Sequence, residues 1–437
     1  MDLLVKNISE LYTGEKDEVL EDVYISIDNN KIKKIAKMEK CPTEDKFSEV
    51  IDAEGMFVLP GFINTHTHSS MTLMRGYADD MPLQKWLENK IWPFEAQLSA
   101  DDIYWGTALG ILEMLKGGTT VFSDMYFSME RVAEIVEKSG IRAVLAEGLI
   151  EANDGKEGLQ SAVDFAREFN NSAEGRITTM IAPHAPYTCS QEYLVEIRDK
   201  ALEHNIPLHI HLSETRGEVE DFLEKEGKSP VKFLNDIDFF CCHTLAAHCV
   251  HLEEGDMEII KDKNVHVAHN PVSNAKLGSG IAPVVDYLQN GVNISIGTDG
   301  VSSNNNLDMI TEARMAAYLQ KVNNYDPAVI DKMDLLQFIT KNGAEALALK
   351  KLGVLKKGYK ADLLLIDSSS ESFSYPHHNN LSNLFYASDS RVVDTVIING
   401  KIVVDSGEVK TLDEEKIYYE VEKRAADIAD KLKNDEN

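Results

Sequence analysis

Residues 57–68 read FVLPGFINTHTH, a short apolar run that ends in two histidines separated by one residue. A loop and a plausible helix follow it, which is the order expected of a strand in a parallel sheet with crossover helices. Seven similar runs follow in chain order: TTVFSDMYF (119–127), RAVLAEGLI (142–150), ITTMIAPHAP (177–186), IPLHIHLSE (206–214), LAAHCVHL (245–252), VHVAHNP (265–271) and NISIGTDG (293–300). Eight such strands over roughly 300 residues predict a (β/α)8 barrel, an α/β fold that typically takes ~250 residues or more.

Both ends of the chain read as β structure. VYISIDNNKIKKIA (23–36) alternates apolar and polar residues around an Asn-Asn pair, which predicts a hairpin. Near the other end, ADLLLID (361–367) and VVDTVIINGKIVVDSGEV (392–409) give further strands, with Asn399-Gly400 at a hairpin turn. We expect these strands to form one small β-sandwich domain built from both chain ends.

The expected organisation is a barrel inserted into this discontinuous β domain. Residues 1–56 give the first part of the β-sandwich, residues 57–350 the barrel, and residues 351–437 the second part of the β-sandwich. The final stretch, 412–437, is rich in charge and predicts a terminal surface helix. We see no linker between separate modules and no internal repeat.

The composition excludes several classes of protein. The 437 residues include 44 Lys+Arg and 73 Asp+Glu, which gives a formal net charge of −29. That field repels the phosphates of nucleic acids and acidic membrane surfaces, so neither is an expected partner. The hydrophobic fraction of 43% suffices for a large core, and no run reaches the roughly 18 apolar residues of a transmembrane helix.

The cysteines and the first residues predict a cytoplasmic protein. The five cysteines are odd in number and form no C-x-x-C, so neither a disulfide framework nor a cysteine-based zinc site is expected. The chain does not start with a basic segment followed by an apolar one, the pattern of a targeting peptide. Free thiols suit the reducing cytoplasm.

Histidines gather at the ends of the predicted strands, which form the active-site face of a (β/α)8 barrel. His66 and His68 lie two residues apart on a strand, so both side chains point to one side and can bind one metal ion. His211 and His248 end two further strands, and Asp299 ends the last one. Taken alone, each histidine could simply be hydrogen-bonded at a strand end, and Asp299 could be a turn residue. Their shared position favours one common site.

These residue types indicate a zinc or ferrous ion, since neutral imidazoles and a carboxylate are the ligands that both ions accept. His66, His68, His211 and Asp299 would bind one divalent ion and leave room for a water. A bound ion lowers the pKa of such a water from 15.7 toward ~7, which makes hydroxide available at neutral pH. The sequence therefore predicts a metal-dependent hydrolytic site.

Two further residues suit proton transfer. His248 fits the second base that this chemistry needs, and Glu214, three residues after His211, fits a general acid. His209 lies one layer deeper, and we interpret it as a buried, hydrogen-bonded histidine rather than a ligand. Other catalytic templates are missing from the sequence: H-E-x-x-H, H-x-E with P-C-x-x-C, G-x-S-x-G, the Walker A loop and G-x-G-x-x-G.

These stretches resemble the amidohydrolase superfamily over nearly the whole chain. PGFINTHTH, IHLSE, AAHCVHL, HNPVSNAKLGSGIAP and GTDG are similar to its strand ends, and KKGYKADLLLID and VDTVIINGKIVVDSG to its C-terminal β-sandwich segments. Within it, the chain most resembles the 5-methylthioadenosine/S-adenosylhomocysteine deaminases, through MTLMRGYADDMPLQKWLENKIWPFE (71–95), APHAPYTCS (182–190) and TDGVSSNNNLDM (298–309). The resemblance implies hydrolytic deamination of 5′-modified adenosines (5′-methylthioadenosine, S-adenosylhomocysteine, 5′-deoxyadenosine or adenosine) to the inosine analogue and ammonia.

The resemblance also implies how many metal ions are bound. Superfamily members with two metal ions usually carry a carboxylated lysine at the end of the fourth strand. Here ITTMIAPHAPY (177–187) has no lysine, and Lys156, the only lysine between Ser139 and Lys200, falls in an expected loop. This favours the one-metal form, which is the deaminase type, with Zn(II) expected and Fe(II) as the alternative.

The family roles carry over by motif position. Glu214 would contact and protonate ring N1 of the adenine. His248 would orient and deprotonate the attacking water. Asp299, besides binding the metal, would pass a proton toward the departing ammonia. These assignments follow from the resemblance and agree with the residue types at the predicted strand ends.

Three more residues would contact the nucleoside. Glu95, in the WPFE motif, would accept charge-assisted hydrogen bonds from the ribose hydroxyls. His184, in the APHAPY motif, would touch the nucleoside, and Trp86 would pack against it. The alternatives are a surface helix carboxylate for Glu95 and a tryptophan of the hydrophobic core for Trp86.

One stretch departs from the family pattern. Members that accept S-adenosylhomocysteine can use arginines after the third strand to hold the amino-acid carboxylate. Here residues 143–160 read AVLAEGLIEANDGKEGLQ, with Glu147 and Gly158 about where arginines would stand and only Lys156 as a cation. We therefore expect S-adenosylhomocysteine to be a poorer substrate than 5′-methylthioadenosine, 5′-deoxyadenosine or adenosine.

Competing functions remain open at this point. One is a different hydrolase on the same scaffold, acting on guanine, cytosine, a triazine or an amide, because a fold alone does not determine the substrate. Another is a metal-binding scaffold without catalysis, which the presence of Glu214 and His248 disfavours. A nucleic-acid deaminase conflicts with the charge of −29. The resemblance also allows a homo-oligomer, dimer or tetramer, although no interface is legible in the sequence.

Overall fold

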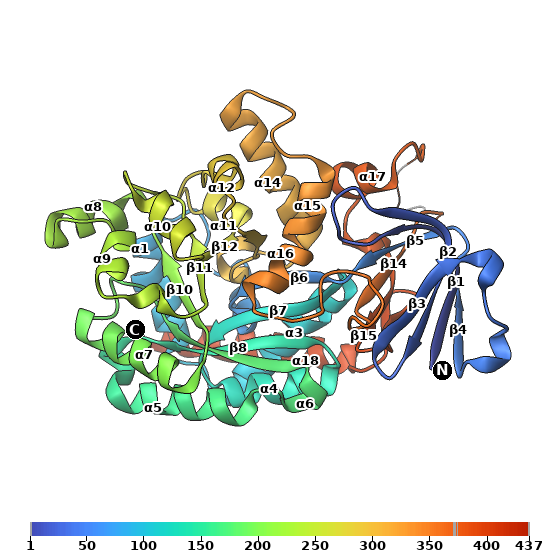
Figure 1. The fold of residues 1–437 in the computed structure, drawn as a ribbon. Coiled ribbons are helices and arrows are strands. Elements are labelled where there is room, and N and C mark those ends of the chain that lie inside the picture. Colours follow the sequence, from blue (N-terminus) through green and yellow to red (C-terminus); the bar gives the residue numbers. More distant parts are fainter. Residues whose placement is uncertain (1, 370–372, 374, 436–437) are drawn as a thin grey trace.

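The computed structural model describes residues 2–369, 373 and 375–435, and its strands form two sheets (Figure 1). One is an eight-stranded parallel sheet in the middle of the chain. The other is a nine-stranded mixed sheet made from both chain ends. The predicted α/β barrel with a β domain contributed by both ends is therefore confirmed.

The parallel sheet curls into the barrel in simple chain order. Its strands are β6 (Phe62–Thr67), β7 (Thr119–Tyr126), β8 (Arg142–Leu149), β9 (Ile177–Pro183), β10 (Leu208–Leu212), β11 (Thr244–His248), β12 (His266–His269) and β13 (Ile294–Ile296). Seven of the eight apolar runs contain one of these strands, and β11 begins one residue before its run, at Thr244. Hydrogen bonds join the first strand to the segment after the last: Asn64 Nδ2 donates to Thr298 Oγ1 at 2.7 Å and Asp299 N donates to His66 O at 2.9 Å.

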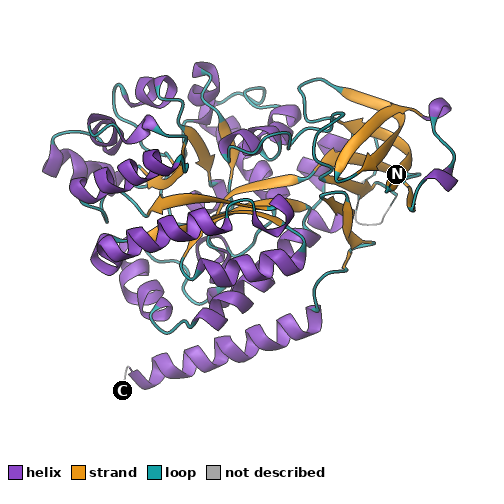
Figure 2. Ribbon diagram, turned by 60° about the horizontal axis from the view of Figure 1, so that its bottom comes forward, coloured by secondary structure: helices purple, strands orange, loops and turns teal. Residues whose placement is uncertain are grey.

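Helices follow the strands and cover the outside of the barrel (Figure 2). In α4 (Met129–Ser139) the buried residues Met129, Val132, Ala133 and Val136 recur three and four positions apart, so one face of the helix packs on the sheet. The other main helices are α3 (Ala100–Lys116), α5 (Glu151–Phe169), α7 (Gln191–His204), α8 (Arg216–Glu226), α9 (Pro230–Asp236), α10 (Asp256–Asp262), α12 (Val284–Asn290), α14 (Met309–Asn324), α15 (Lys332–Phe338) and α16 (Lys341–Ala346).

The amino end of the barrel is filled and closed. Inward-facing side chains two residues apart, such as Val144 and Ala146 on β8, form one apolar cluster with Ala344 of α16. Gly343 lets α16 come close, since a Cβ at that position would lie 2.9 Å from Ile63. The open end is therefore the carboxyl end of the strands, where the predicted site residues lie.

The mixed sheet has the strand order β17-β16-β15-β14-β5-β1-β2-β3, with β4 paired to β1. Both predicted hairpins are present, at Asn29-Asn30 and at Asn399-Gly400, and all four turn residues have positive φ angles. The strands are β1 (Leu3–Tyr12), β2 (Val19–Asp28), β3 (Lys31–Lys37), β4 (Glu49–Asp52), β5 (Met56–Pro60), β14 (Leu363–Asp367), β15 (Val393–Ile398), β16 (Lys401–Asp405) and β17 (Glu408–Val409).

The apolar run at residues 57–68, which we read as one strand, is divided between the two sheets. β5 pairs with β1 and β14 in the mixed sheet, and β6 begins the barrel after Gly61. A Cβ at residue 61 would lie 2.2 Å from Thr120 Oγ1, so the chain can pass here only without a side chain. The crossing between the sheets therefore lies at Gly61, a few residues beyond the expected boundary at residue 57.

A buried ion pair ties the barrel to the mixed sheet. Arg142, at the start of β8, donates to both carboxylate oxygens of Asp362, at 2.6 and 3.1 Å, and to Asn399 Oδ1 at 2.7 Å. Only 2% of the Arg142 and Asp362 side chains is exposed. Since a bidentate pair of this kind fixes geometry, the two sheets are held in a defined relation.

The predicted C-terminal surface helix is present as α18 (Glu414–Asp435), and it runs along the outside of the molecule in Figure 2. Arg424 on this helix donates to Asp102 Oδ1 of α3 at 2.7 Å, and Lys116 pairs with Glu414. Across the described residues, no helix combines the length and the apolar character that crossing a membrane requires.

Candidate active site

Four histidines and one aspartate meet at the carboxyl end of the barrel strands. Asp299 Oδ1 lies 3.3 Å from His68 Nε2 and 3.5 Å from His66 Nε2. His211 Nε2 lies 3.4 Å from His68 Nε2, and the ring of His248 stacks beside that of His211 at 5.5 Å. The structure thus brings together the five residues that the sequence placed at the ends of four different strands.

The hydrogen bonds behind the rings aim their Nε2 atoms at this common point. Nδ1 of His68 donates to Met125 O at 2.6 Å, and Nδ1 of His211 donates to His184 O at 2.7 Å. In the neutral form of both rings Nδ1 therefore carries the proton and Nε2 presents a lone pair. Burial lowers the pKa of His68, but the adjacent Asp299 outweighs this and raises it to about 9, so metal binding at this ring releases a proton. His209 Nε2 lies 3.0 Å from His66 Nδ1 and plays the same supporting part, which agrees with its reading as a buried, hydrogen-bonded histidine.

These residues fit a metal ion. His66 Nε2 is fully buried and has no hydrogen-bond partner within the described part of the chain, although such atoms are usually paired. Burial lowers the pKa of His66 to about 4 and that of His211 well below its usual range, so both imidazoles are neutral, as ligation requires. Two overlapping groups have ligand atoms within 4.8 Å of one another: His66, His68 and Asp299, and His66, His211 and His248.

Asp299 is held firmly in a special backbone conformation. Its φ angle is +62°, and its carboxylate accepts hydrogen bonds from Gly300 N at 2.8 Å, Ser273 Oγ at 2.6 Å and Ser303 Oγ at 3.1 Å. Burial alone would raise the pKa of Asp299, but the adjacent imidazoles of His66 and His68, whose Nε2 atoms face Oδ1, outweigh it and hold the pKa well below its usual range. The carboxylate is therefore charged at neutral pH.

The cluster lies at the bottom of a cavity. One wall is the segment between β6 and α3, which contains α1 (Leu83–Trp86), the π-helical turn η4 (Leu87–Ile91) and α2 (Trp92–Glu95). The cavity lining combines apolar and aromatic side chains with a few polar groups, as is usual for small-molecule sites. Its described lining residues include Trp86, Leu87, Ile91, Trp92, Phe127, Ile150 and Tyr187, and no lysine or arginine.

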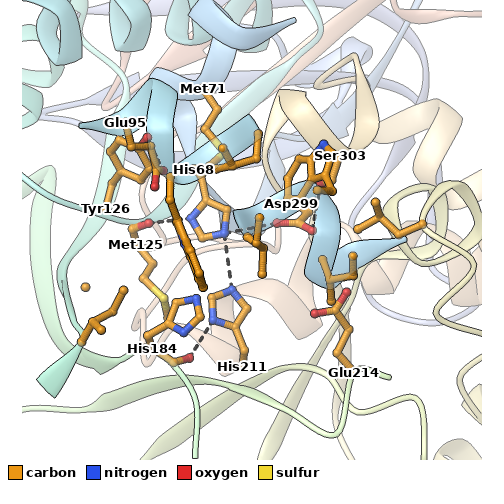
Figure 3. A pocket seen from close by; sticks show the side chains of 18 of the residues that line it. His68, Met71, Glu95, Met125, Tyr126, His184, His211, Glu214, Asp299 and Ser303 are labelled. Atoms are coloured by element: carbon orange, nitrogen blue, oxygen red, sulfur yellow. Dashed lines mark hydrogen bonds and ion pairs between the residues drawn. The ribbon is translucent and has the colours of Figure 1, made fainter. Parts of the chain in front are cut away.

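Two carboxylates stand on opposite sides of His68 in this cavity (Figure 3). Glu95 accepts a hydrogen bond from Tyr126 OH at 2.7 Å. Glu214 accepts one from Ser279 Oγ at 3.1 Å, and its Oε2 lies 3.8 Å from His248 Nε2. Burial raises the pKa of both carboxyl groups above their usual range, so each holds a proton more readily than an exposed glutamate.

The remaining predicted contacts also lie at the cavity. His184 lines it, and its ring lies 4.8 Å from that of His211. Trp86 lines it too, although the side chain is 95% buried and its Nε1 donates to Ala78 O at 2.9 Å. Trp86 therefore belongs to the hydrophobic core and also lines the cavity.

One prediction from the sequence is wrong, and three residues of the site were not predicted. Lys156 lies in α5 rather than in a loop, with 81% of its side chain exposed and paired to Glu196. Of the three residues that were not predicted from the sequence, Tyr126 donates a hydrogen bond to Glu95, Ser273 donates one to Asp299, and Asn274 contacts His248. A signal was present for the last two, because polar residues directly after a barrel strand lie at the active-site face.

The fold and the cluster together define a metal-dependent barrel hydrolase. The chain belongs to the amidohydrolase family, whose sequence model matches residues 57–403. It is 50% identical over 427 residues to a 5-methylthioadenosine/S-adenosylhomocysteine deaminase of Halothermothrix orenii, covering 97% of this chain and 99% of the relative. It is 49% identical to the protein of that name from Pelotomaculum thermopropionicum, covering 97% and 98%.

Among solved structures, the chain is similar to an adenosine deaminase from Xanthomonas campestris with bound zinc. The TM-score is 0.92 at 32% identity, and the match covers 99% of both chains. The zinc in that structure and the histidine–aspartate cluster here both support a metal ion at this site.

Proposed function

We propose that the protein is a metal-dependent deaminase of 5′-modified adenosines, which it converts to the inosine analogue and ammonia. The observation that carries this proposal is the placement of Glu214 and Glu95 on opposite sides of the cluster. An adenosine has its N1–C6 edge at one end and its ribose hydroxyls at the other, so two carboxylates that flank one reactive centre suit both ends. The named deaminase relatives support the same substrate class.

The proposed cofactor is one divalent ion per subunit, Zn(II) first and Fe(II) as the alternative. His66, His68, His211 and Asp299 would hold it. When bound, the ion lowers the pKa of a nearby water toward neutrality and makes hydroxide available for attack at C6. His248 borders the same space, and we assign it to proton transfer because its Nε2 also lies near Glu214.

Glu214 starts the reaction in this proposal. Its raised pKa keeps a proton available, and the carboxyl group donates it to N1 of the purine. Protonation at N1 draws electrons from C6, so the carbon becomes open to attack. Ser279, which donates to Oε1, keeps the carboxyl group turned into the cavity.

His248 and Asp299 manage the remaining protons. His248 accepts a proton from the attacking water, and the new C–O bond forms at C6. Asp299 then takes the proton of the new C6 hydroxyl and passes it to the 6-amino group, the C6–N bond breaks as the C6–O bond becomes a carbonyl, and ammonia leaves while N1 keeps its proton in the inosine-type product. The proton held by His248 returns to Glu214, 3.8 Å away, which restores both groups. His248 and Asp299 are more than nine-tenths buried, so bulk water does not compete for these protons.

The ribose end is assigned to Glu95, which Tyr126 holds in place. The hydrogen bond from Tyr126 uses one carboxylate oxygen and leaves lone pairs for the sugar hydroxyls. His184 and Trp86 complete the wall on which the nucleoside would pack. The proposed compartment is the cytoplasm, where the five free thiols would stay reduced.

A nucleoside panel tests the proposal. With zinc-loaded protein, we expect the absorbance near ~265 nm to fall with 5′-methylthioadenosine, 5′-deoxyadenosine and adenosine, while free adenine and guanine stay inert for lack of the ribose contact. Removal of the metal by a chelator should stop turnover, and added zinc should restore it. If the metal-bound protein turned over none of the adenosines, the substrate would lie elsewhere in the family.

The cavity lining predicts the relative kcat/KM for S-adenosylhomocysteine and 5′-methylthioadenosine. S-adenosylhomocysteine carries a carboxylate, and no described cavity residue is a lysine or arginine that could pair with it. An unpaired charge costs about 1.5–3 kcal/mol, so we expect kcat/KM at least about tenfold lower than for 5′-methylthioadenosine. Steady-state kinetics with both nucleosides checks this ranking.

A matched analogue isolates the cause. The 3-aminopropyl thioether of 5′-thioadenosine keeps the chain and the ammonium group of S-adenosylhomocysteine but lacks the carboxylate. We expect it to recover most of the lost kcat/KM. A kcat/KM for S-adenosylhomocysteine that equals or exceeds that for 5′-methylthioadenosine would contradict the prediction.

A further inference from the structure

A short helix after β12 supports both proton-handling residues from behind. This helix, α11 (Pro271–Lys276), carries Ser273 and Asn274 at adjacent positions, and both are fully buried. Ser273 Oγ donates to Asp299 Oδ2 at 2.6 Å, and Asn274 Oδ1 lies 2.8 Å from His248 Nδ1. The proposed mechanism so far gives Asn274 no part.

The contact between Asn274 and His248 determines which ring nitrogen carries the proton. An amide oxygen can only accept, so a hydrogen bond at 2.8 Å requires the proton of the neutral imidazole to lie on Nδ1. The amide nitrogen of Asn270 is farther from the same Nδ1, at 3.3 Å. Nε2 of His248 is then unprotonated and faces Glu214 across the cavity, 3.8 Å away.

Nothing else in the described part of the chain uses the Asn274 side chain. Its Nδ2 is buried and has no hydrogen-bond partner there. A buried amide nitrogen without a hydrogen-bond partner lowers the stability of the fold. The contact with His248 is therefore the one role that the described structure gives this side chain. The backbone of His248 is also in the left-handed region, at φ +72°, a strained conformation that the surrounding structure has to hold.

We propose that Asn274 is a positioning residue that holds His248 in the Nδ1–H tautomer, so that Nε2 can accept a proton from the attacking water. This inference rests on the proposed function. In the step itself, an O–H bond of water breaks, the proton forms a bond with Nε2, and the resulting imidazolium keeps donating its Nδ1–H to Asn274. Without the amide oxygen, the buried Nδ1–H has no acceptor and the other tautomer, with Nε2 protonated, blocks the transfer.

Two substitutions separate the hydrogen bond from packing. Asn274→Leu keeps the volume and removes the acceptor, whereas Asn274→Asp keeps an acceptor oxygen for Nδ1–H and replaces the unpaired nitrogen by a second, charged oxygen. With metal-loaded protein and 5′-methylthioadenosine, we expect Asn274→Leu to lower kcat about 10–100-fold, the range for supporting hydrogen bonds to a site histidine. KM and bound metal should change little, and Asn274→Asp should recover most of kcat.

Asn342→Leu is the matched control. Asn342 lies in α16 at the closed end of the barrel, where its Nδ2 donates to Ile294 O at 2.9 Å. The same replacement there removes a side-chain hydrogen bond far from His248, so we expect parental kcat. Parental kcat in Asn274→Leu, or an equal loss in Asn274→Leu and Asn274→Asp, would overturn the inference.

A spectroscopic readout keeps this test independent of the substrate. Long-range 1H–15N spectra of the metal-loaded protein distinguish a protonated from an unprotonated ring nitrogen, and comparison with His248→Gln assigns the signals of His248. We expect an unprotonated Nε2 in the parent and loss of that preference in Asn274→Leu. A protonated Nε2 in the neutral ring of the parent would overturn the inference. If no adenosine were turned over but the spectra matched, only the proposed function would fail.

Discussion

Glu214→Gln is expected to abolish most turnover while the protein keeps its metal. Glutamine has the same shape and can still accept from Ser279, but it has no acidic proton for N1 of the purine. Loss of a general acid typically costs about 10²–10⁴-fold, and we expect kcat for 5′-methylthioadenosine to fall by that amount. Steady-state kinetics together with metal analysis measures both parts of the prediction.

Glu220→Gln provides the control for this substitution. Glu220 lies on the same helix that follows Glu214, α8, where it pairs with Arg216 at the surface. The chemical change is the same as in Glu214→Gln, but Glu220 does not line the cavity, so we expect kcat to stay unaltered. Full activity in Glu214→Gln would remove Glu214 from the acid role.

Asp299→Ala should lose activity and metal together, because one residue is both ligand and proton carrier. The substitution removes the oxygen that lies 3.3 Å from His68 Nε2 and 3.5 Å from His66 Nε2. We expect the loss of kcat to exceed the about 10⁴-fold upper range of a single acid or base. Elemental analysis of the dialysed protein should show metal well below one ion per subunit.

A second variant separates the charge of Asp299 from its shape. In Asp299→Asn the amide oxygen can still accept from Gly300 N, and the amide nitrogen can donate to the hydroxyl oxygens of Ser273 and Ser303, which accept as well as donate, so the backbone conformation at this position should persist. We expect weaker metal binding than in the parent, with the fold retained as judged by circular dichroism. Metal content in Asp299→Ala equal to that of the parent would contradict the ligand assignment.

The strands of the barrel could be predicted because their signal is local. Each coincides with one of the eight apolar runs, apart from Thr244 at the start of β11, and positions two apart on a strand share a face whatever the rest of the chain does. The two hairpins were equally legible, since Asn29-Asn30 and Asn399-Gly400 can adopt the positive φ angles that tight turns need. The rule that barrel sites lie at the carboxyl ends of the strands then brought His66, His68, His211, His248 and Asp299 to one place.

The division of residues 57–68 between two sheets was not legible. Phe57 and Phe62 are both fully buried, so the apolar pattern continues across the crossing. The strands β5 and β6 meet at Gly61, where Thr120, far along the chain, comes too close to leave room for a side chain. The helix that contains Lys156 was missed for a local reason, since Gly155 sits inside it with a non-helical φ of +52°.

Local patterns in the chain were therefore enough to predict the barrel, the β domain from both ends and the end of the barrel at which the histidines and Asp299 meet, because strand periodicity and turn chemistry act over a few residues. Only the folded molecule decides how those residues are supported and what surrounds them. Tyr126 reaches Glu95 and Asn274 reaches His248 through hydrogen bonds between separate elements. The absence of lysine and arginine among the described residues that line the cavity is likewise decided by segments far apart in the chain. Such contacts depend on distance in space, which no spacing along the sequence encodes.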